Sequence, residues 1–264
     1  MKRNPPKSDN IFVLLLILFI IFGLIFLLHQ QKLKAPKPAG EIAFVIDDWG
    51  YNLNNVELLS EIKRPVTLAI LPHRRYSEVI SKKVKEDCPS CDIILHLPLE
   101  SKSDRTPEPN TIRRNMQEEK VLSVLRGDIR SVPGIIGVSN HQGSKATENK
   151  ELMKRILSEL KRKNLFFLDS RTTPVSVCGN IAKKIGLRYA ERDIFLDLSQ
   201  KKDPEQYKAY VRKQMRSLVK AAKQKGAAIG IGHDKRLTLE VIKESIPDIE
   251  KEDIKIVPLK KLVR

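Results

Sequence analysis

The sequence predicts an α/β protein: an irregular (β/α) barrel of about seven strands, preceded by one N-terminal transmembrane helix. Short apolar runs alternate with amphipathic segments from about residue 41 to residue 264, which is typical of parallel βα units. Several of these runs end in aspartate or histidine, as strands do where α/β barrels build their sites. A doubly wound open sheet is the alternative. The chain has no G-x-G-x-x-G and no G-x-x-x-x-G-K-[ST], which argues against nucleotide binding through those loops.

The N-terminal region predicts a membrane anchor. Residues 11–28 are apolar apart from Gly23, which is long enough for a spanning helix. No small-x-small cleavage site follows directly, so an uncleaved anchor is favoured over a cleaved signal peptide. Basic residues flank both ends; we expect the amino terminus inside and the domain outside the cytoplasm, in the periplasm. The predicted parts are a basic tail at 1–10, the anchor at 11–28, a Pro-rich linker at 29–40 and a domain at 41–264.

The first strand of the domain carries the most informative polar residues. Residues 42–46 are β-prone without clean alternation, which favours a strand that is buried on both faces. Asp47 and Asp48 follow at its carboxyl end. Further strands are predicted at 66–71, 92–97, 134–138, 165–168, 187–190, 227–231 and 254–257. Helices are predicted at 112–129, 152–160, 176–185, 207–222 and 239–245.

Composition limits the function classes. The 264-residue chain is 41% hydrophobic and 31% charged, so it can form a packed core. The net charge is +17, but no nucleic-acid recognition motif accompanies it, and we expect no nucleic-acid partner. Cys88 and Cys91 have C-x-x-C spacing without the second pair that a zinc ribbon needs. A local disulfide and two plain thiols both fit this pair. The oligomeric state is not predicted.

Aspartate and histidine follow the apolar runs at seven positions. In a parallel barrel these ends share one rim, so residues far apart in sequence converge. Carboxylate and imidazole together suit zinc or a similar divalent ion. Each residue also has an ordinary structural interpretation, since an aspartate can cap a helix and a histidine can simply be hydrogen-bonded. The residues are Asp47, Asp48, His96, His141, Asp169, Asp193 and His233.

Six segments in order resemble the divergent polysaccharide deacetylases, a branch of the carbohydrate esterase family 4 fold. The resemblance extends over about residues 41–262 and implies an irregular (β/α) barrel. The segments are Ile-Asp-Asp-Trp-Gly at 46–50, His-Leu-Pro-Leu-Glu at 96–100, Ser-Asn-His-Gln-Gly-Ser at 139–144, Phe-Leu-Asp-Ser-Arg-Thr at 167–172, Arg-Asp-Ile-Phe-Leu-Asp at 192–197 and Gly-Ile-Gly-His at 230–233.

The resemblance implies roles for individual residues. Asp47 matches the general base of the parent family and Asp48 its metal-binding carboxylate. The parent holds the ion with two further histidines in one His-x-x-x-His turn, whereas Leu-Pro-Leu-Glu follows His96 here. We therefore expect His141, from the next strand end, to complete the metal site with Asp48 and His96. His233 resembles the catalytic acid. The branch's own motifs contribute the supporting residues Asp169, Arg171, Arg192, Asp193 and Asp197.

The sequence as a whole predicts a membrane-anchored hydrolase that depends on a divalent metal, with zinc preferred, and that removes N-acetyl groups from an envelope polysaccharide. The alternative is a non-catalytic envelope protein that keeps the barrel and binds a glycan or a partner. The basic helix between Lys208 and Lys225 would then be the binding surface.

Overall fold

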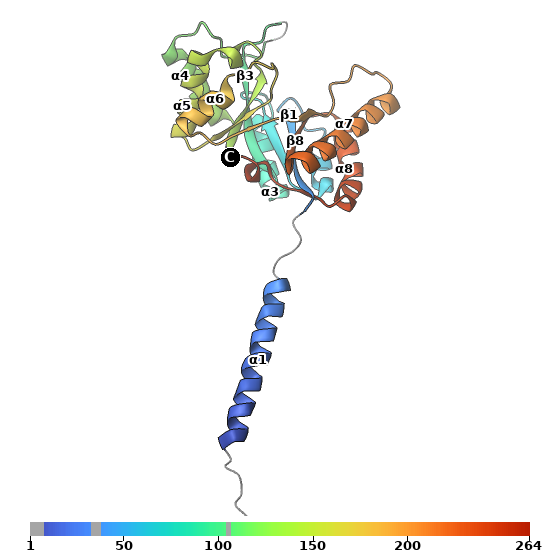
Figure 1. The fold of residues 1–264 in the computed structure, drawn as a ribbon. Coiled ribbons are helices and arrows are strands. Elements are labelled where there is room, and N and C mark those ends of the chain that lie inside the picture. The colour runs from blue at the N-terminus through green and yellow to red at the C-terminus, as the bar shows by residue number, and fades with distance from the viewer. Residues whose placement is uncertain (1–7, 33–37, 104–106) are drawn as a thin grey trace, which may run out of the picture. The chain divides into compact units, whose positions relative to one another are not determined.

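The computed structural model describes residues 8–32, 38–103 and 107–264. The chain divides into two compact units, Met1–Pro38 and Ala39–Arg264. Most of the predicted basic tail and residues 33–37 of the predicted linker lie outside the described residues. The second unit holds the sheet (Figure 1), and all the predicted site residues belong to it.

The first unit contains helix α1, Ser8–Lys32. Its described side chains run from Phe12 to Phe26, and nearly all of them are exposed and apolar. No helix in the described part of the chain is both long and apolar enough to cross a membrane. The transmembrane helix predicted at 11–28 is therefore not confirmed.

All strand pairs in the second unit are parallel, as the alternation predicts. Eight strands run in the order β6-β5-β4-β3-β2-β1-β8-β7, and β9 pairs with β1. The described residues therefore form nine strands rather than about seven. The strands predicted at 187–190 and 254–257 correspond to β6 and β9, whereas no strand was predicted for β7, which is only two residues long. The strands are β1 (Gly40–Trp49), β2 (Val66–Ile70), β3 (Asp92–Leu99), β4 (Gly137–Gln142), β5 (Phe166–Asp169), β6 (Tyr189–Glu191), β7 (Ile194–Phe195), β8 (Ala227–His233) and β9 (Ile254–Ile256).

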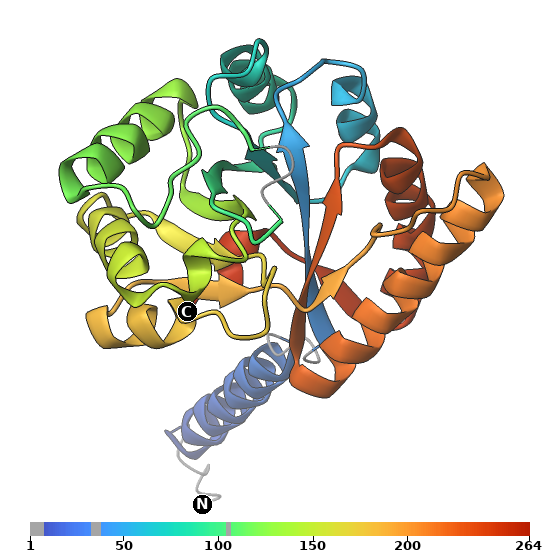
Figure 2. The ribbon, with the colours of Figure 1, turned by 90° about the horizontal axis from the view of Figure 1, so that it is seen from above.

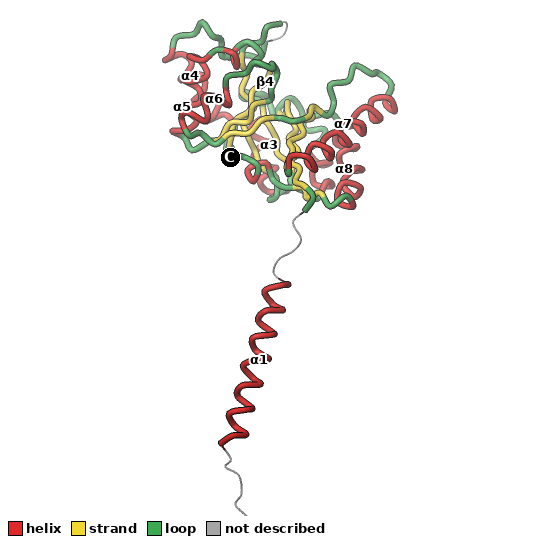
Figure 3. Tube along the Cα trace, viewed as in Figure 1, coloured by secondary structure: helices red, strands yellow, loops and turns green. Residues whose placement is uncertain are grey.

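Helices surround the strands on the outside, as the view from above shows (Figure 2). Helices α2 and α3 were not predicted, and α4 begins at Glu118 rather than at residue 112. Ile112 forms an isolated bridge with Leu99 instead of belonging to a helix. The tube in Figure 3 shows the same layers. The helices are α2 (Val56–Ile62), α3 (Ser77–Asp87), α4 (Glu118–Ser131), α5 (Lys150–Arg162), α6 (Cys178–Ile185), α7 (Pro204–Lys225) and α8 (Arg236–Lys251).

The curved sheet is not closed, since β6 and β7 do not pair with each other. Its interior holds a separate apolar cluster that includes Val45, Phe166 and Ile231. The C-terminal residues 258–264 pack onto this cluster through Leu259, Leu262 and Val263. The last residue also exchanges two backbone hydrogen bonds with Tyr189 of β6. The C-terminal segment thus fills the interior of the open barrel.

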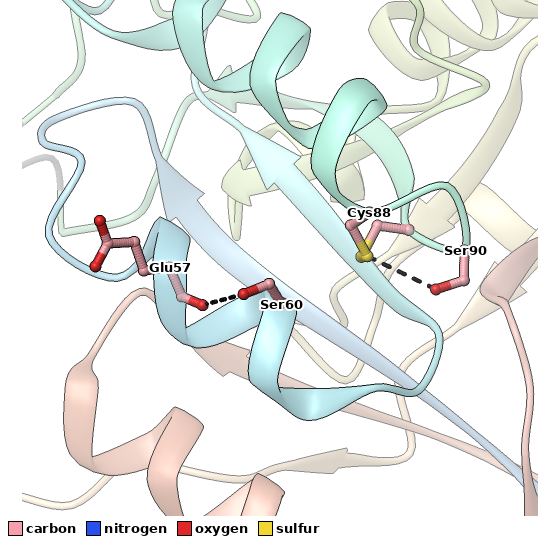
Figure 4. Close-up of a disulfide and its surroundings, with 5 residues drawn as sticks. Glu57, Ser60, Cys88 and Ser90 are labelled. Atoms are coloured by element: carbon pink, nitrogen blue, oxygen red, sulfur yellow. Dashed lines mark hydrogen bonds between the residues drawn. A yellow bond between two sulfur atoms is a disulfide. The ribbon is translucent and has the colours of Figure 1, made fainter.

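Cys88 and Cys91 form a disulfide between the end of α3 and the start of β3. Ser90 lies beside it, with its hydroxyl 3.6 Å from the Cys88 sulfur (Figure 4). The sequence was compatible with either a local disulfide or two free thiols at these positions, and the structure has the disulfide. Cys178 is a free, buried thiol.

Candidate metal and catalytic site

Three of the predicted residues meet at the carboxyl ends of β1, β3 and β4. Asp48, His96 and His141 each offer one ligand atom, and these atoms all lie within 4.8 Å of one another. Asp48 Oδ1 lies 3.0 Å from His141 Nδ1 and 3.3 Å from His96 Nε2. The rings of His96 and His141 meet edge to face with centroids 5.0 Å apart. Parallel pairing of β3 with β4 brings these distant residues together.

The backbone and a neighbouring hydroxyl fix this group. Asp48 has a φ of 68°, in the left-handed region, and non-glycine residues held there often lie in functional sites. His96 is almost fully buried, and its Nδ1 lies 2.8 Å from Ser139 Oγ, which directs its Nε2 toward Asp48. Burial lowers the pKa of His96 to about 4. The imidazole is therefore neutral at neutral pH, as a metal ligand must be.

Asp48 itself is ionised. Burial acts to raise its pKa, but hydrogen bonds from His141 and His96 outweigh burial and hold the pKa well below its ordinary value. One carboxylate and two imidazoles form the donor set of a three-ligand catalytic metal site with a position left for water or substrate. These three residues fit a divalent ion by their chemistry and by their spacing.

Glu100 occupies the position where the parent motif has its second histidine, and it takes no part in this group. Its carboxylate accepts a hydrogen bond from the backbone N–H of Arg114 and pairs with Lys145 at 2.7 Å. The motif lies on β3, which continues to Leu99, so one helical turn does not bring residues 96 and 100 together. His141, rather than residue 100, lies with Asp48 and His96 in this group.

Asp47 lies beside the three residues and is 2% exposed. Its Oδ2 is 3.5 Å from His96 Nε2, whereas its Oδ1 is buried without a hydrogen-bond partner. Burial raises the pKa of Asp47 well above its ordinary value, and the charges of Asp48 and Asp197 add to this rise. A bound cation would offset this excess of negative charge. The unpaired Oδ1 is thus a second observation that fits a metal.

His233 stands next to Asp47, since the two residues are register partners on β8 and β1. Its Nδ1 lies 2.7 Å from Asp197 Oδ1, and its backbone N–H donates to Asp197 Oδ2. Burial acts to lower the pKa of His233, but the hydrogen bond and charge of Asp197 raise it to about 9. His233 is therefore a cation at neutral pH and can donate a proton from its other nitrogen.

Arg192 supports the site from the turn between β6 and β7. Its guanidinium donates to the carbonyls of Ser170 and Arg171 and lies 3.7 Å from the ring centroid of Phe195. Phe195 in turn stacks on His233 with centroids 6.0 Å apart. The positive charge of Arg192 acts to lower the pKa of Asp47.

The other three predicted supporting residues do not contact the metal group. Asp169 is fully buried and accepts hydrogen bonds from Arg171 N–H, Ser176 and Tyr189, so it shapes the loop after β5. The Arg171 side chain pairs with Glu191 at 3.7 Å. Asp193 pairs with Lys225 and accepts from the N–H of Ile229, which fixes β7 against β8.

Several residues that hold the site in place had no predicted role. Ser139 orients His96, while Thr238 donates to Asp197 at 2.8 Å and Tyr207 lies 3.5 Å from the same carboxylate. Ser139 could have been found, because it precedes His141 by two positions and residues i and i+2 of a strand share a face. Thr238 and Tyr207 lie on α8 and α7, where no strand-end pattern indicates them.

His73 also has a partner that the sequence did not indicate. Its Nε2 lies 3.0 Å from Asp128 on α4, and its backbone N–H donates to Ser131. Asp128 is buried, and burial raises its pKa to about 7. This pair joins the loop after β2 to α4 and lies apart from the metal group.

The domain matches a known family over almost its whole length. Residues 44–263 match the sequence profile described as divergent polysaccharide deacetylase. The chain belongs to the divergent polysaccharide deacetylase family. Two relatives have uncharacterized functions. YibQ of Escherichia coli strain K12 is 31% identical over 82% of this chain and 67% of its own length. A protein of Haemophilus influenzae is 34% identical over 85% of this chain and 77% of its own length.

Solved structures share the fold of this divergent polysaccharide deacetylase. An uncharacterized protein of Agrobacterium tumefaciens has a TM-score of 0.78 at 20% identity, covering 87% of this chain and 91% of that one. The Bc1960 peptidoglycan N-acetylglucosamine deacetylase has a TM-score of 0.53 at 10% identity, covering 86% of this chain and 89% of its own. At these identities the likeness concerns the fold alone.

The basic face of α7 in this family member is partly neutralised. Lys208, Arg212 and Lys223 pair with glutamates 240, 244 and 252, each at 2.9 Å. The first two glutamates lie on α8, which runs beside α7 (Figure 1), and Glu252 directly follows it. Three of the basic side chains that suggested a binding surface on α7 are therefore engaged in ion pairs with α8 and the residue after it.

Proposed function

We propose that the protein is a metal-dependent hydrolase that removes acetyl groups from N-acetylated sugars of an envelope polysaccharide. Membership of the divergent polysaccharide deacetylase family supports the reaction class. The observation that carries the proposal is the convergence of Asp48, His96 and His141 beside a buried carboxylate and a protonated histidine. Hydrolysis of an amide needs a polarised carbonyl, a base for water and an acid for the leaving amine.

Each residue of the site has one task in this proposal. Asp48, His96 and His141 would hold a divalent ion, with zinc preferred for this donor set. When bound, such an ion supplies a Lewis acid for the carbonyl and favours the ionised form of water. Asp47 would accept the proton of the attacking water. His233, held by Asp197, would donate a proton to the amine nitrogen as the carbon–nitrogen bond breaks, giving acetate and a free amino sugar.

Metal content and acetate release test this proposal together. We expect the purified full-length chain to bind one divalent ion and to release acetate from N-acetylglucosamine oligomers. A chelator should stop the release, and zinc should restore it. Absence of acetate release from the metal-loaded chain would contradict the enzyme. Retention of glycan binding in that case would favour the non-catalytic interpretation.

We also propose that the domain works outside the cytoplasm, in the periplasm, and associates with the membrane through residues 11–28. The Cys88–Cys91 disulfide supports an oxidising compartment. The exposed apolar side chains of α1 from Phe12 to Phe26 support contact with lipid. Alkaline phosphatase and fluorescent-protein fusions to the C-terminus test the location. Activity of the phosphatase fusion is expected, and cytoplasmic fluorescence alone would contradict the proposal.

A further inference from the structure

Exposed apolar side chains gather at the end of the barrel that holds the site. Outside α1, five large apolar side chains of the described residues are exposed: Tyr51, Leu53, Val79, Val175 and Leu198. Four of them lie in loops that follow β1, β5 and β7, and only Val79 lies on a helix, α3. The loops at the end of the barrel that holds the site therefore carry four of the five exposed large apolar side chains of the described domain. A ligand with apolar faces, such as a sugar ring, suits this surface.

Tyr51 is the aromatic residue among them, and its ring is fixed from two sides. Its hydroxyl donates to the carboxylate of Glu108. The guanidinium of Arg74 lies 5.0 Å from the ring centroid and also pairs with Glu108. Both partners are largely buried, whereas Tyr51 remains 48% exposed. One face of the ring is thus covered and the phenol is held, while much of the ring stays open to solvent.

The position of Tyr51 is close to the reacting centre. It follows Asp48 by three residues, and the loop between them is tied to the loop after β2 by the hydrogen bonds Leu71 N–H to Trp49 and Tyr76 N–H to Gly50. Asp48 is near enough for its charge to act on the Tyr51 phenol: burial and then Asp48 raise the pKa of Tyr51, against Arg74. A sugar on this ring would neighbour a sugar at the metal group.

We propose that Tyr51 is a stacking platform for the sugar next to the one that loses its acetyl group, and that Arg74 and Glu108 hold the ring in place. The C–H face of a pyranose packs on an aromatic ring, and a ring that is already fixed loses little conformational entropy on binding. The platform makes the substrate an oligomer rather than a single sugar. This inference rests on the proposed deacetylase function.

Binding of N-acetylglucosamine and of its linear trimer tests the platform. Titration calorimetry on the full-length chain, in an Asp47→Asn background that prevents turnover, gives the ratio of trimer affinity to monomer affinity. Tyr51→Leu should reduce this ratio roughly three- to tenfold, the range expected for one aromatic contact. Val79→Ser is the matched control, because Val79 is equally exposed, at 47%, but lies on α3; its ratio should not change.

A double-mutant cycle separates positioning from a merely structural effect. Glu108→Ala should reduce the trimer-to-monomer ratio when Tyr51 is present and leave it unchanged in the Tyr51→Leu background. An unchanged ratio in Tyr51→Leu, or an equal fall in Val79→Ser, would overturn the platform. Acetate release by the chain with Asp47 intact is measured separately. If the chain releases acetate but the trimer-to-monomer affinity ratio does not depend on Tyr51, the platform alone is refuted. If that ratio depends on Tyr51 but no acetate is released, the deacetylase function alone is refuted. A chain that binds neither sugar refutes the platform.

Discussion

Asp197 binds His233 twice, through the imidazole Nδ1 at 2.7 Å and through the backbone N–H at 2.9 Å. Asp197 is fully buried and 36 residues away in sequence. Because the carboxylate accepts from Nδ1, the Nε2 of His233 remains available to donate a proton. The pair sets both the orientation and the charge of the proposed acid.

The pH dependence of activity should report this pair. The pKa of His233 is raised to about 9, so the proton-donating form is present below that pH and is lost as the pH rises through about 9. We expect the alkaline limb of acetate release near pH 9. Asp197→Asn should move that limb to lower pH and reduce the rate by roughly 10²-fold or more. A pH–rate profile of both proteins checks this; an alkaline limb that does not move would remove His233 as the acid.

Metal content should depend on His141 and not on Glu100. His141→Ala removes one of three ligand atoms and should lower the bound metal from about one ion per chain to a small fraction. Glu100→Gln is the control within the motif, since Glu100 faces Lys145 and Arg114. Elemental analysis of both variants after dialysis decides the matter. Loss of metal from Glu100→Gln with retention in His141→Ala would reverse the assignment.

We expect Ser139 to affect metal affinity although it is not one of the proposed metal ligands. Ser139→Ala removes the hydroxyl that holds Nδ1 of His96, so the ring can rotate and bind the ion less well. Loss of such a supporting contact typically weakens metal affinity 10–100-fold. Competition with a chelator of known affinity measures the change. Ser144→Ala, in the loop after β4, serves as the comparison, and equal losses in both variants would show that the effect is not specific to His96.

The stability of the domain should depend on the protonation of Asp128. Its folded-state pKa is raised to about 7 by burial, so its contribution to stability is fully present below about pH 4 and is lost as the pH rises through about 7. Asp128→Asn abolishes this loss. Between pH 5 and pH 8 the variant should gain roughly 1–3 kcal/mol relative to the parent. Urea unfolding at both pH values measures the difference, with His73→Gln as control for the exposed partner.

A gain for Asp128→Asn that is the same at both pH values would contradict this account. It would mean that the Asp128 carboxylate, 3.0 Å from His73, keeps the same charge throughout that range.

The sequence by itself determined the parallel βα pattern and the positions at which polar residues follow strands. Asp47, Asp48, His96, His141 and His233 were all found in this way, because the carboxyl ends of parallel strands meet at one rim. The family motifs then separated Asp47 from Asp48 as proposed base and ligand. The positions of these residues along the chain were enough to place them at that rim, because the direction of a strand fixes which of its ends a residue occupies.

Only the tertiary structure decided which strand-end residues face the same point. Glu100 pairs with Lys145, and Asp193 pairs with Lys225. Neither carboxylate faces the metal group, although each belongs to a sequence motif that also contains a residue of the site. Asp197 contacts His233, and Ser139 contacts His96. Both contacts depend on side-chain geometry across neighbouring strands and loops. The packing of residues 258–264 into the open barrel is likewise a long-range contact. Periodicity reports which face of an element is buried, whereas a side chain's partner depends on segments far away in the chain.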